Sequence, residues 1–88
     1  MDSLNYHHLR VFWTTVREGG VTRASEKLHV SQPTVTSQIR SLEHALGQTL
    51  FKRSGRTLLL TEAGRSAYRY ADEMVGLEVG RDEQGRAR

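Results

Sequence analysis

The side chains best suited to specific recognition are concentrated in one short segment, residues 31–40, with the sequence SQPTVTSQIR. Its hydroxyl and amide groups both donate and accept hydrogen bonds, and Arg40 can offer two parallel N–H groups to a pair of acceptors. Glutamate and lysine, which cover most solvated helix faces, do not occur in this segment. These residue types indicate binding through hydrogen bonds to a polar surface.

An amphipathic helix must position these side chains. Its apolar residues recur at intervals of four, three and four residues and form one stripe: Val35, Ile39, Leu42 and Leu46. A proline is tolerated in the first helical turn, where its missing N–H costs nothing, and Gly47 is typical of a helix end. The face opposite the stripe carries the polar set and the proline: Pro33, Thr34, Thr36, Ser37 and Arg40.

Two shorter helical patterns precede this segment. Asn5 is a good N-cap for the first, which ends at the pair Gly19-Gly20. The spacing of its large apolar residues predicts that they belong to the core: Leu9, Phe12, Trp13 and Val16. Thr22 can cap a second helix, and only two residues separate that helix from the third. This arrangement predicts a helix-turn-helix over about residues 21–40.

A hairpin and a long helix follow. Two short apolar runs flank Ser54-Gly55, a dipeptide typical of tight turns, so we expect a β-hairpin over about residues 50–60. Thr61 can cap a fourth helix that runs from Glu62 to about Leu77. The polar, glycine-broken tail of residues 79–88 is expected to be disordered.

The complete order of elements is that of a winged helix-turn-helix. We therefore expect a mainly α fold of three helices and a β-hairpin wing, followed by a long linker helix. Short side chains would let the third helix enter the major groove of DNA, where hydroxyl and amide groups bond base edges and arginine bonds guanine. Residues 1–61 hold eight basic and four acidic side chains, an excess that suits a polyanionic partner.

Other functions lack the residues they need. The chain has no cysteine, which excludes disulfides and thiolate metal sites and fits a cytoplasmic protein. His7 and His8 would diverge on a helix, so we expect no metal site and no cofactor. Without a Gly-rich phosphate loop or suitably paired carboxylates, we expect no enzyme. The longest apolar run, Leu58–Leu60, is too short to span a bilayer.

One family combines these features. About residues 4–64 resemble the N-terminal DNA-binding domain of LysR-type transcriptional regulators. The motifs that carry this resemblance are VSQP.V..QI..LE..LG, LF.R.GR and LT.AG. Three further segments, LNYHHL, FW and YRYADEM, resemble the subgroup that regulates bacterial sodium/proton antiporters. Ser37 departs from the common pattern, because many members carry arginine there; a base contact by that arginine is therefore not transferred.

The resemblance implies a winged domain over residues 4–61 and a dimerisation helix over residues 62–78. It implies a bacterial, cytoplasmic protein of the nucleoid that binds double-stranded DNA, with an interrupted palindrome as its site. Two copies would pair through the linker helix, and a longer regulator would form higher oligomers. The family's C-terminal effector-binding domain has no counterpart in these residues, so we expect a DNA-binding fragment that senses no small molecule itself.

Candidate DNA contacts lie at the start of the second helix, along the third helix and in the wing: Thr22, Arg23, Ser31, Gln32, Pro33, Thr34, Thr36, Ser37, Arg40, Arg53 and Arg56.

The candidate dimer seam has heptad-like spacing, widened by two further residues: Ala63, Ala67, Tyr70, Met74 and Leu77, with Ala71 and Val75. Arg40 could contact phosphate, read a base or pair with Glu43 or His44. The alternative function is a winged helix that docks a protein, which apolar residues on the outer face would favour.

Overall fold

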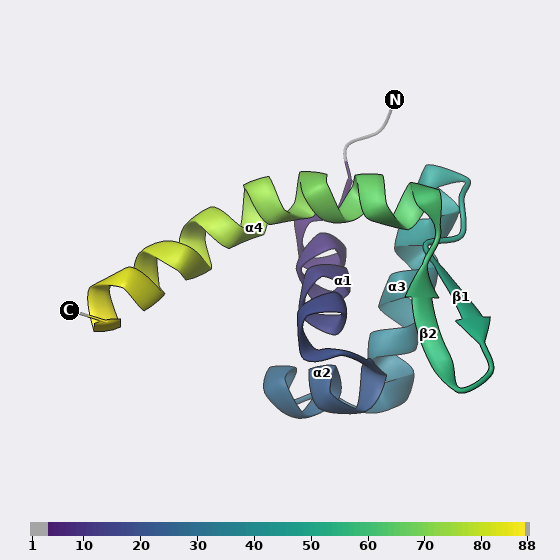
Figure 1. Ribbon diagram of the computed structural model, residues 1–88, viewed down its shortest axis with the longest axis horizontal. Coiled ribbons are helices and arrows are strands. Elements are labelled where there is room, and N and C mark those ends of the chain that lie inside the picture. The colour runs from purple at the N-terminus through teal and green to yellow at the C-terminus, as the bar shows by residue number, and fades with distance from the viewer. Residues whose placement is uncertain (1–3, 88) are drawn as a thin grey trace.

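A computed structural model describes the backbone of residues 4–87 and the side chains of residues 4–76. Over these residues the chain forms four helices and one antiparallel hairpin (Figure 1). In chain order the elements are α1 (Tyr6–Glu18), α2 (Val21–Leu28), α3 (Gln32–Leu46), β1 (Phe51–Ser54), β2 (Thr57–Leu60) and α4 (Glu62–Ala87). The mainly α winged helix-turn-helix fold is confirmed.

Local capping explains where α1 begins and where it meets α2. The side chain of Asn5 accepts a hydrogen bond from the N–H of His8 at 3.1 Å, as an N-cap should. Gly19 adopts the left-handed conformation, with φ of 87°, and ends α1. The carbonyl of Gly20 already accepts from the N–H of Ala24, so α2 starts at Val21. The prediction that Thr22 caps α2 is therefore wrong.

A tight turn joins α2 to α3. His29 ends α2 in the left-handed conformation, with φ of 60°, and its N–H donates to the carbonyl of Glu26 at 3.3 Å. Ser31 then caps α3, because its side chain accepts from the N–H of Thr34. Pro33 lies in the first turn of α3, as predicted.

The core lies between the first three helices and the near half of α4. It consists of side chains that are almost completely buried: Leu9, Val11, Phe12, Trp13, Ala24, Val35, Ile39, Leu42, Leu50, Ala71 and Val75. The predicted stripe of α3 supplies three of these residues, while Leu46 is half-buried beside them. Phe12 and Trp13 belong to the core, as their spacing predicted.

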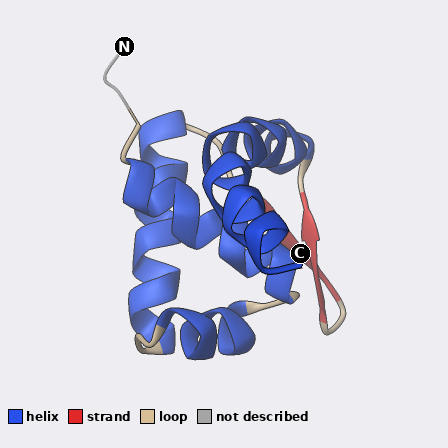
Figure 2. Cartoon of the chain, turned by 90° about the vertical axis from the view of Figure 1, so that its left-hand side faces the viewer, coloured by secondary structure: helices blue, strands red, loops and turns tan. Residues whose placement is uncertain are grey.

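The hairpin is held at its base and free at its tip. Phe51 packs edge to face against Phe12 of α1, with ring centroids 5.4 Å apart, and Leu50 is fully buried just before β1. Ser54 pairs with Thr57, which leaves Gly55 and Arg56 as a two-residue turn. Gly55 has φ of 64°, the left-handed region that the first turn residue of a type II′ hairpin requires. The hairpin lies at one edge of the helical domain (Figure 2).

The start of α4 is clamped to the loop before β1. The hydroxyl of Thr61 accepts from the N–H of Gly64 at 2.9 Å and donates to the carbonyl of Thr49 at 2.6 Å. Gly64 lies so close to this loop that a Cβ there would be 2.1 Å from the carbonyl oxygen of Leu50. Only glycine permits this approach without displacing the backbone.

From this clamp α4 crosses α1 and continues beyond the domain (Figure 1). Its helix reaches Ala87, so the predicted end near residue 77 and the predicted disordered tail are both wrong. The residues after 78 contain no proline, and the glycines at 80 and 85 do not interrupt the helix. The helix therefore extends well past the region that contacts the domain.

Two residues of the predicted dimer seam belong to the core instead. Ala71 and Val75 are completely buried in the hydrophobic cluster of the domain, so the prediction that they widen the seam is wrong. Ala63 and Ala67 are half-buried against the same cluster. Tyr70 and Met74 remain exposed, and the side chain of Leu77 lies outside the residues whose side chains are described.

The close approach at Gly64 makes a testable prediction about stability. Gly64→Ala should lower the free energy of unfolding by about 1–3 kcal/mol, because the added methyl group overlaps the Leu50 carbonyl. Urea denaturation followed by circular dichroism measures this change. Ser66→Ala, at an exposed position of the same helix, is the control and should change stability by less than about 0.5 kcal/mol. A Gly64→Ala protein more stable than the original would show that the clamp is absent.

Candidate nucleic-acid interface

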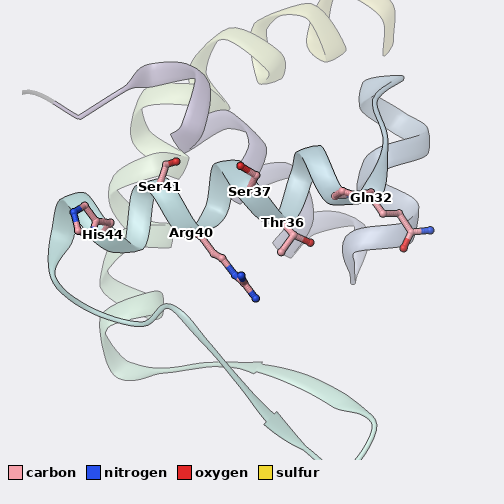
Figure 3. Close-up of a pocket in the computed structure, with 7 residues that line it drawn as sticks. Gln32, Thr36, Ser37, Arg40, Ser41 and His44 are labelled. Atoms are coloured by element: carbon pink, nitrogen blue, oxygen red, sulfur yellow. The ribbon is translucent and has the colours of Figure 1, made fainter.

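The predicted polar face of α3 is one continuous surface. Gln32, Pro33, Ser37 and Arg40 are exposed, and Thr36 is half-buried between them. Together with two residues further along the helix they line an open groove of about 1130 Å³. In Figure 3 the labelled side chains follow one helix, and the guanidinium of Arg40 extends away from it toward the hairpin. A helix with this face presents hydrogen-bonding groups without long side chains at its centre.

Two residues of this groove were not among the predicted contacts. Ser41 and His44 lie beyond Arg40 on α3, are both exposed and line the same groove (Figure 3). Their spacing from Ser37, at four and seven residues, places them on the same helix face. That spacing was available in the sequence and could have identified them.

Two predicted contact residues also support the helix. The hydroxyl of Ser31 accepts from the N–H of Thr34 at 3.2 Å and shares a 2.8 Å hydrogen bond with the hydroxyl of Thr34. Both side chains thus satisfy groups at the start of α3. Among the described residues, Ser37 has no intramolecular hydrogen bond, so its hydroxyl is available to a ligand.

Glu43 has a structural role that bears on Arg40. A carboxylate oxygen of Glu43 accepts from the N–H of Leu50 at 2.8 Å, which ties the end of α3 to the strand that follows. Among the described residues no ion pair joins Arg40 to Glu43 or to His44. Of the three roles considered for Arg40, ion pairing is therefore not observed, and contact with a phosphate or a base remains.

The remaining predicted contacts flank the groove. Arg53 lies in β1 opposite Leu58, and Arg56 lies in the turn at the hairpin tip; both are exposed. In Figure 1 the hairpin lies on the side of α3 away from α2. Thr22 and Arg23 are exposed in the first turn of α2. The fold thus places the three predicted groups on α2, α3 and the wing, with α3 in the middle.

Neither a metal cluster nor a membrane segment occurs in the described part of the chain. No three histidine, aspartate or glutamate side chains there come together as metal ligands would. No helix over these residues has the length and apolar character needed to cross a bilayer.

Comparison with known proteins places this geometry in a family. The family described as "Bacterial regulatory helix-turn-helix protein, lysR family" matches residues 6–65, which include α1, the helix-turn-helix, the hairpin and the clamp of α4. The chain belongs to the LysR family. The matched range contains every predicted DNA contact of this LysR-family chain.

Two curated relatives are both longer than this LysR-family chain. The transcriptional activator protein NhaR of Escherichia coli is 48% identical over 77 residues, which are 88% of this chain and 26% of NhaR. A RuBisCO operon transcriptional regulator of Allochromatium vinosum is 46% identical over 68 residues, which are 77% of this chain and 22% of that protein. The chain therefore spans about a quarter of the length of these relatives.

Solved structures include isolated domains bound to DNA. The CbnR DNA-binding domain in its DNA complex is 33% identical to this chain and has a TM-score of 0.76. The match covers 96% of this chain and 97% of the CbnR domain. The BenM DNA-binding domain bound to benA site 1 DNA is 31% identical with a TM-score of 0.78, over 94% of that chain and 96% of this one. The fold of this LysR-family chain is thus that of a domain solved in contact with DNA.

Ser31 differs from the other candidate DNA contacts because its side chain also caps α3, so its replacement should affect stability. Ser31→Ala should lower the free energy of unfolding by about 0.5–2 kcal/mol without any ligand, because it removes the N-cap of α3. Ser37→Ala is the matched control and should change it by less than about 0.5 kcal/mol. Urea denaturation of both variants without DNA tests this. Equal effects would contradict a special role for Ser31 in capping.

Proposed function

We propose that this chain binds double-stranded DNA sequence-specifically, as the DNA-binding part of a bacterial transcription regulator. The observation that carries this proposal is the exposed polar face of α3, flanked by a wing whose tip carries arginine. Similarity to the CbnR and BenM domains solved with DNA supports it. Large apolar side chains, which a protein-docking face would need, do not line the groove of α3.

In this proposal α3 lies in the major groove. Gln32, Thr36 and Ser37 supply amide and hydroxyl groups that bond base edges, and the methyl group of Thr36 can contact a thymine methyl. Pro33 adds a compact apolar contact at the start of the helix. Arg40 extends toward the wing side of α3 (Figure 3), where its guanidinium would bind a backbone phosphate. Short side chains at the centre of the face let the helix approach the bases closely.

The wing and α2 would hold the domain in register on the DNA backbone. Arg53 and Arg56 are exposed on the hairpin, where they would bind phosphates or enter the adjacent minor groove. Thr22 and Arg23 lie in the first turn of α2, whose free N–H groups also suit a phosphate. Such contacts add affinity that is independent of sequence and falls with salt.

Two copies would pair through α4. Tyr70 and Met74 are 47% and 46% exposed and lie one turn apart, so they form an apolar strip on a helix that continues beyond the domain. Burying each could contribute about 1.5–3 kcal/mol, whereas association costs about 4–15 kcal/mol. The dimer formed by these residues should therefore be weak without DNA. An interrupted palindrome would strengthen it by holding both copies at fixed spacing.

Sequence selection from a random duplex pool tests the proposal as a whole. We expect enrichment of one interrupted palindrome, with two half-sites separated by about 10 base pairs or a multiple of that spacing. Enrichment of a single half-site would support DNA binding but not pairing. A pool that stays random at both low and moderate salt would refute sequence-specific binding.

Two single variants should separate phosphate contacts from base contacts. Arg56→Ala should weaken binding to cognate and scrambled duplexes alike, and should reduce the slope of log affinity against log salt by about 0.9 per lost phosphate contact. Gln32→Ala should cost about 1–3 kcal/mol on the cognate duplex and little on the scrambled one. Fluorescence anisotropy at several salt concentrations measures both quantities. A Gln32→Ala loss of equal size on both duplexes would assign that residue to non-specific binding.

Sedimentation should reveal the role of the exposed strip of α4. Met74→Lys should shift a concentration-dependent dimer toward monomer, because it places a charge in the apolar contact. It should also weaken binding to a palindrome much more than to one half-site. Met74→Leu keeps an apolar side chain and is the matched control. A parent chain that is monomeric at millimolar concentration and binds palindromes one copy at a time would contradict pairing through α4.

A further inference from the structure

A hydrogen bond between Trp13 and Asp72 joins the winged domain to the linker helix. The indole Nε1 of Trp13, in α1, donates to Oδ1 of Asp72, in α4, at 2.8 Å. Trp13 is 7% exposed, and this bond satisfies the only donor of its side chain within the domain, whereas Asp72 lies at the surface. Because the acceptor is a carboxylate, the bond is of the stronger, charge-assisted kind.

Two neighbouring residues, Arg17 and Gly76, lie against the hydrogen-bonded pair. The guanidinium of Arg17 lies over the Trp13 ring at 4.8 Å from the centroid. Gly76 is one turn after Asp72, and a Cβ there would lie 3.0 Å from the bonded oxygen Oδ1. A larger residue at position 76 would press against the carboxylate, so the glycine leaves room for the bond.

Beyond the first turn of α4, this bond supplies a directional constraint that the apolar contacts of the helix lack. The start of α4 is fixed where Thr61 and Gly64 meet the loop before β1. Farther along, Ala71 and Val75 make apolar contacts, which are non-directional and tolerate small sliding and tilting. The Trp13–Asp72 bond is directional and joins two named atoms. It therefore provides a second fixed point, and two fixed points define the direction of a helix.

The direction of α4 has a large effect at its far end. From Asp72 to Ala87 the helix covers roughly 22 Å at 1.5 Å per residue. A tilt of about 10° at Asp72 would therefore move the end of the helix by about 4 Å. In a pair joined along α4, the same tilt turns each winged domain relative to its partner and so changes the separation of the two α3 helices along DNA.

We infer that the Trp13–Asp72 hydrogen bond sets the direction of α4 and thereby the half-site spacing that a dimer of this chain accepts. The spacing part rests on the proposed function, while the positioning part concerns the chain alone. Both are positioning roles, since neither side chain belongs to the candidate DNA contacts. The two residues come from FW and YRYADEM, segments that lie outside the helix-turn-helix itself.

Distance measurement in the chain without DNA tests the positioning part. Because the chain has no cysteine, Glu26→Cys in α2 and Gln84→Cys in α4 would be the only sites for a pair of spin labels. Labelled chain is diluted with unlabelled chain so that only distances within one copy are recorded by pulsed electron resonance. The parent should show one narrow distance distribution.

Four substitutions are compared in this labelled background. Trp13→Phe and Asp72→Ala remove the bond. Because Gln84 lies about 18 Å along the helix from Asp72, each variant should shift the mean distance by about 3 Å or broaden it by as much. Asp72→Asn keeps an acceptor oxygen and should restore most of the narrow distribution. Glu73→Ala removes the adjacent exposed carboxylate, which has no indole partner, and should change nothing. Unchanged distributions in both bond-removing variants would overturn the inference.

The Asp72→Ala variant is expected to fold, because Asp72 is exposed and its loss leaves the core intact. It therefore keeps the test valid if a substitution of the core residue Trp13 prevents folding. Circular dichroism of each variant confirms that the helices are present before distances are compared. If Trp13→Phe fails to fold, the Asp72 variants decide the positioning part alone.

Binding to a panel of palindromes tests the spacing part. Half-sites from the selected sequence are placed at the preferred spacing and at one base pair more and fewer. Removing the bond should reduce the preference for one spacing about fivefold, the lower end of usual coupling between sites, and leave affinity for a single half-site unchanged. A changed distance with an unchanged spacing profile would refute the spacing role. A parent chain that binds no duplex would refute the proposed function, while the distance measurement would still decide whether the bond directs α4.

Discussion

Burial of one stripe of α3 against α1 determines which side chains of this protein are available for recognition. Val35 and Leu42 are almost completely buried, and Ile39 is 6% exposed. Burying each contributes about 1.5–3 kcal/mol, so rotation of α3 about its axis would be strongly unfavourable. With the apolar side fixed inward, the helical period places Ser37 and Arg40 on the outer side. The recognition face is thus a consequence of the core.

The wing depends on the same core. Phe51 packs on Phe12, and Leu50 is fully buried, so the base of the hairpin is anchored while its tip projects. Glu43 strengthens this link, since its carboxylate accepts the N–H of Leu50 and joins the end of α3 to the hairpin. The recognition helix and the base of the wing are therefore anchored in the same core. Groups positioned in this way need little further ordering when they bind.

Small residues let α4 pack closely on the domain. Gly64 approaches the carbonyl of Leu50, Ala71 is buried beside α1, and Gly76 leaves space for the Trp13–Asp72 pair. This docking uses part of the apolar surface that a heptad-like pattern would assign to a second copy. Exposed Tyr70 shows where the docked side of α4 ends. The same helix thus serves the core on one side and offers a narrow apolar strip on the other.

Local patterns in the sequence determined most of the element boundaries and the recognition face. The N-cap at Asn5, the turn at Gly55 and the stripe of α3 act through neighbours within a few residues, so spacing alone identifies them. The same helical spacing places Ser41 and His44 on the recognition face of α3. The predicted contacts omitted these two residues because the predicted face stopped at Arg40.

Only the tertiary structure decided which partner each apolar or polar group meets. A stripe that includes Ala71 has the same spacing whether the domain or a second copy covers it, and burial places Ala71 in the core of its own domain. Thr22 has the residue type of a cap, but the backbone at Gly20 starts α2 earlier. Trp13 and Asp72 are 59 positions apart, and no periodicity relates them. Their hydrogen bond exists because packing brings α4 across α1, which is a property of the folded chain and not of any local segment.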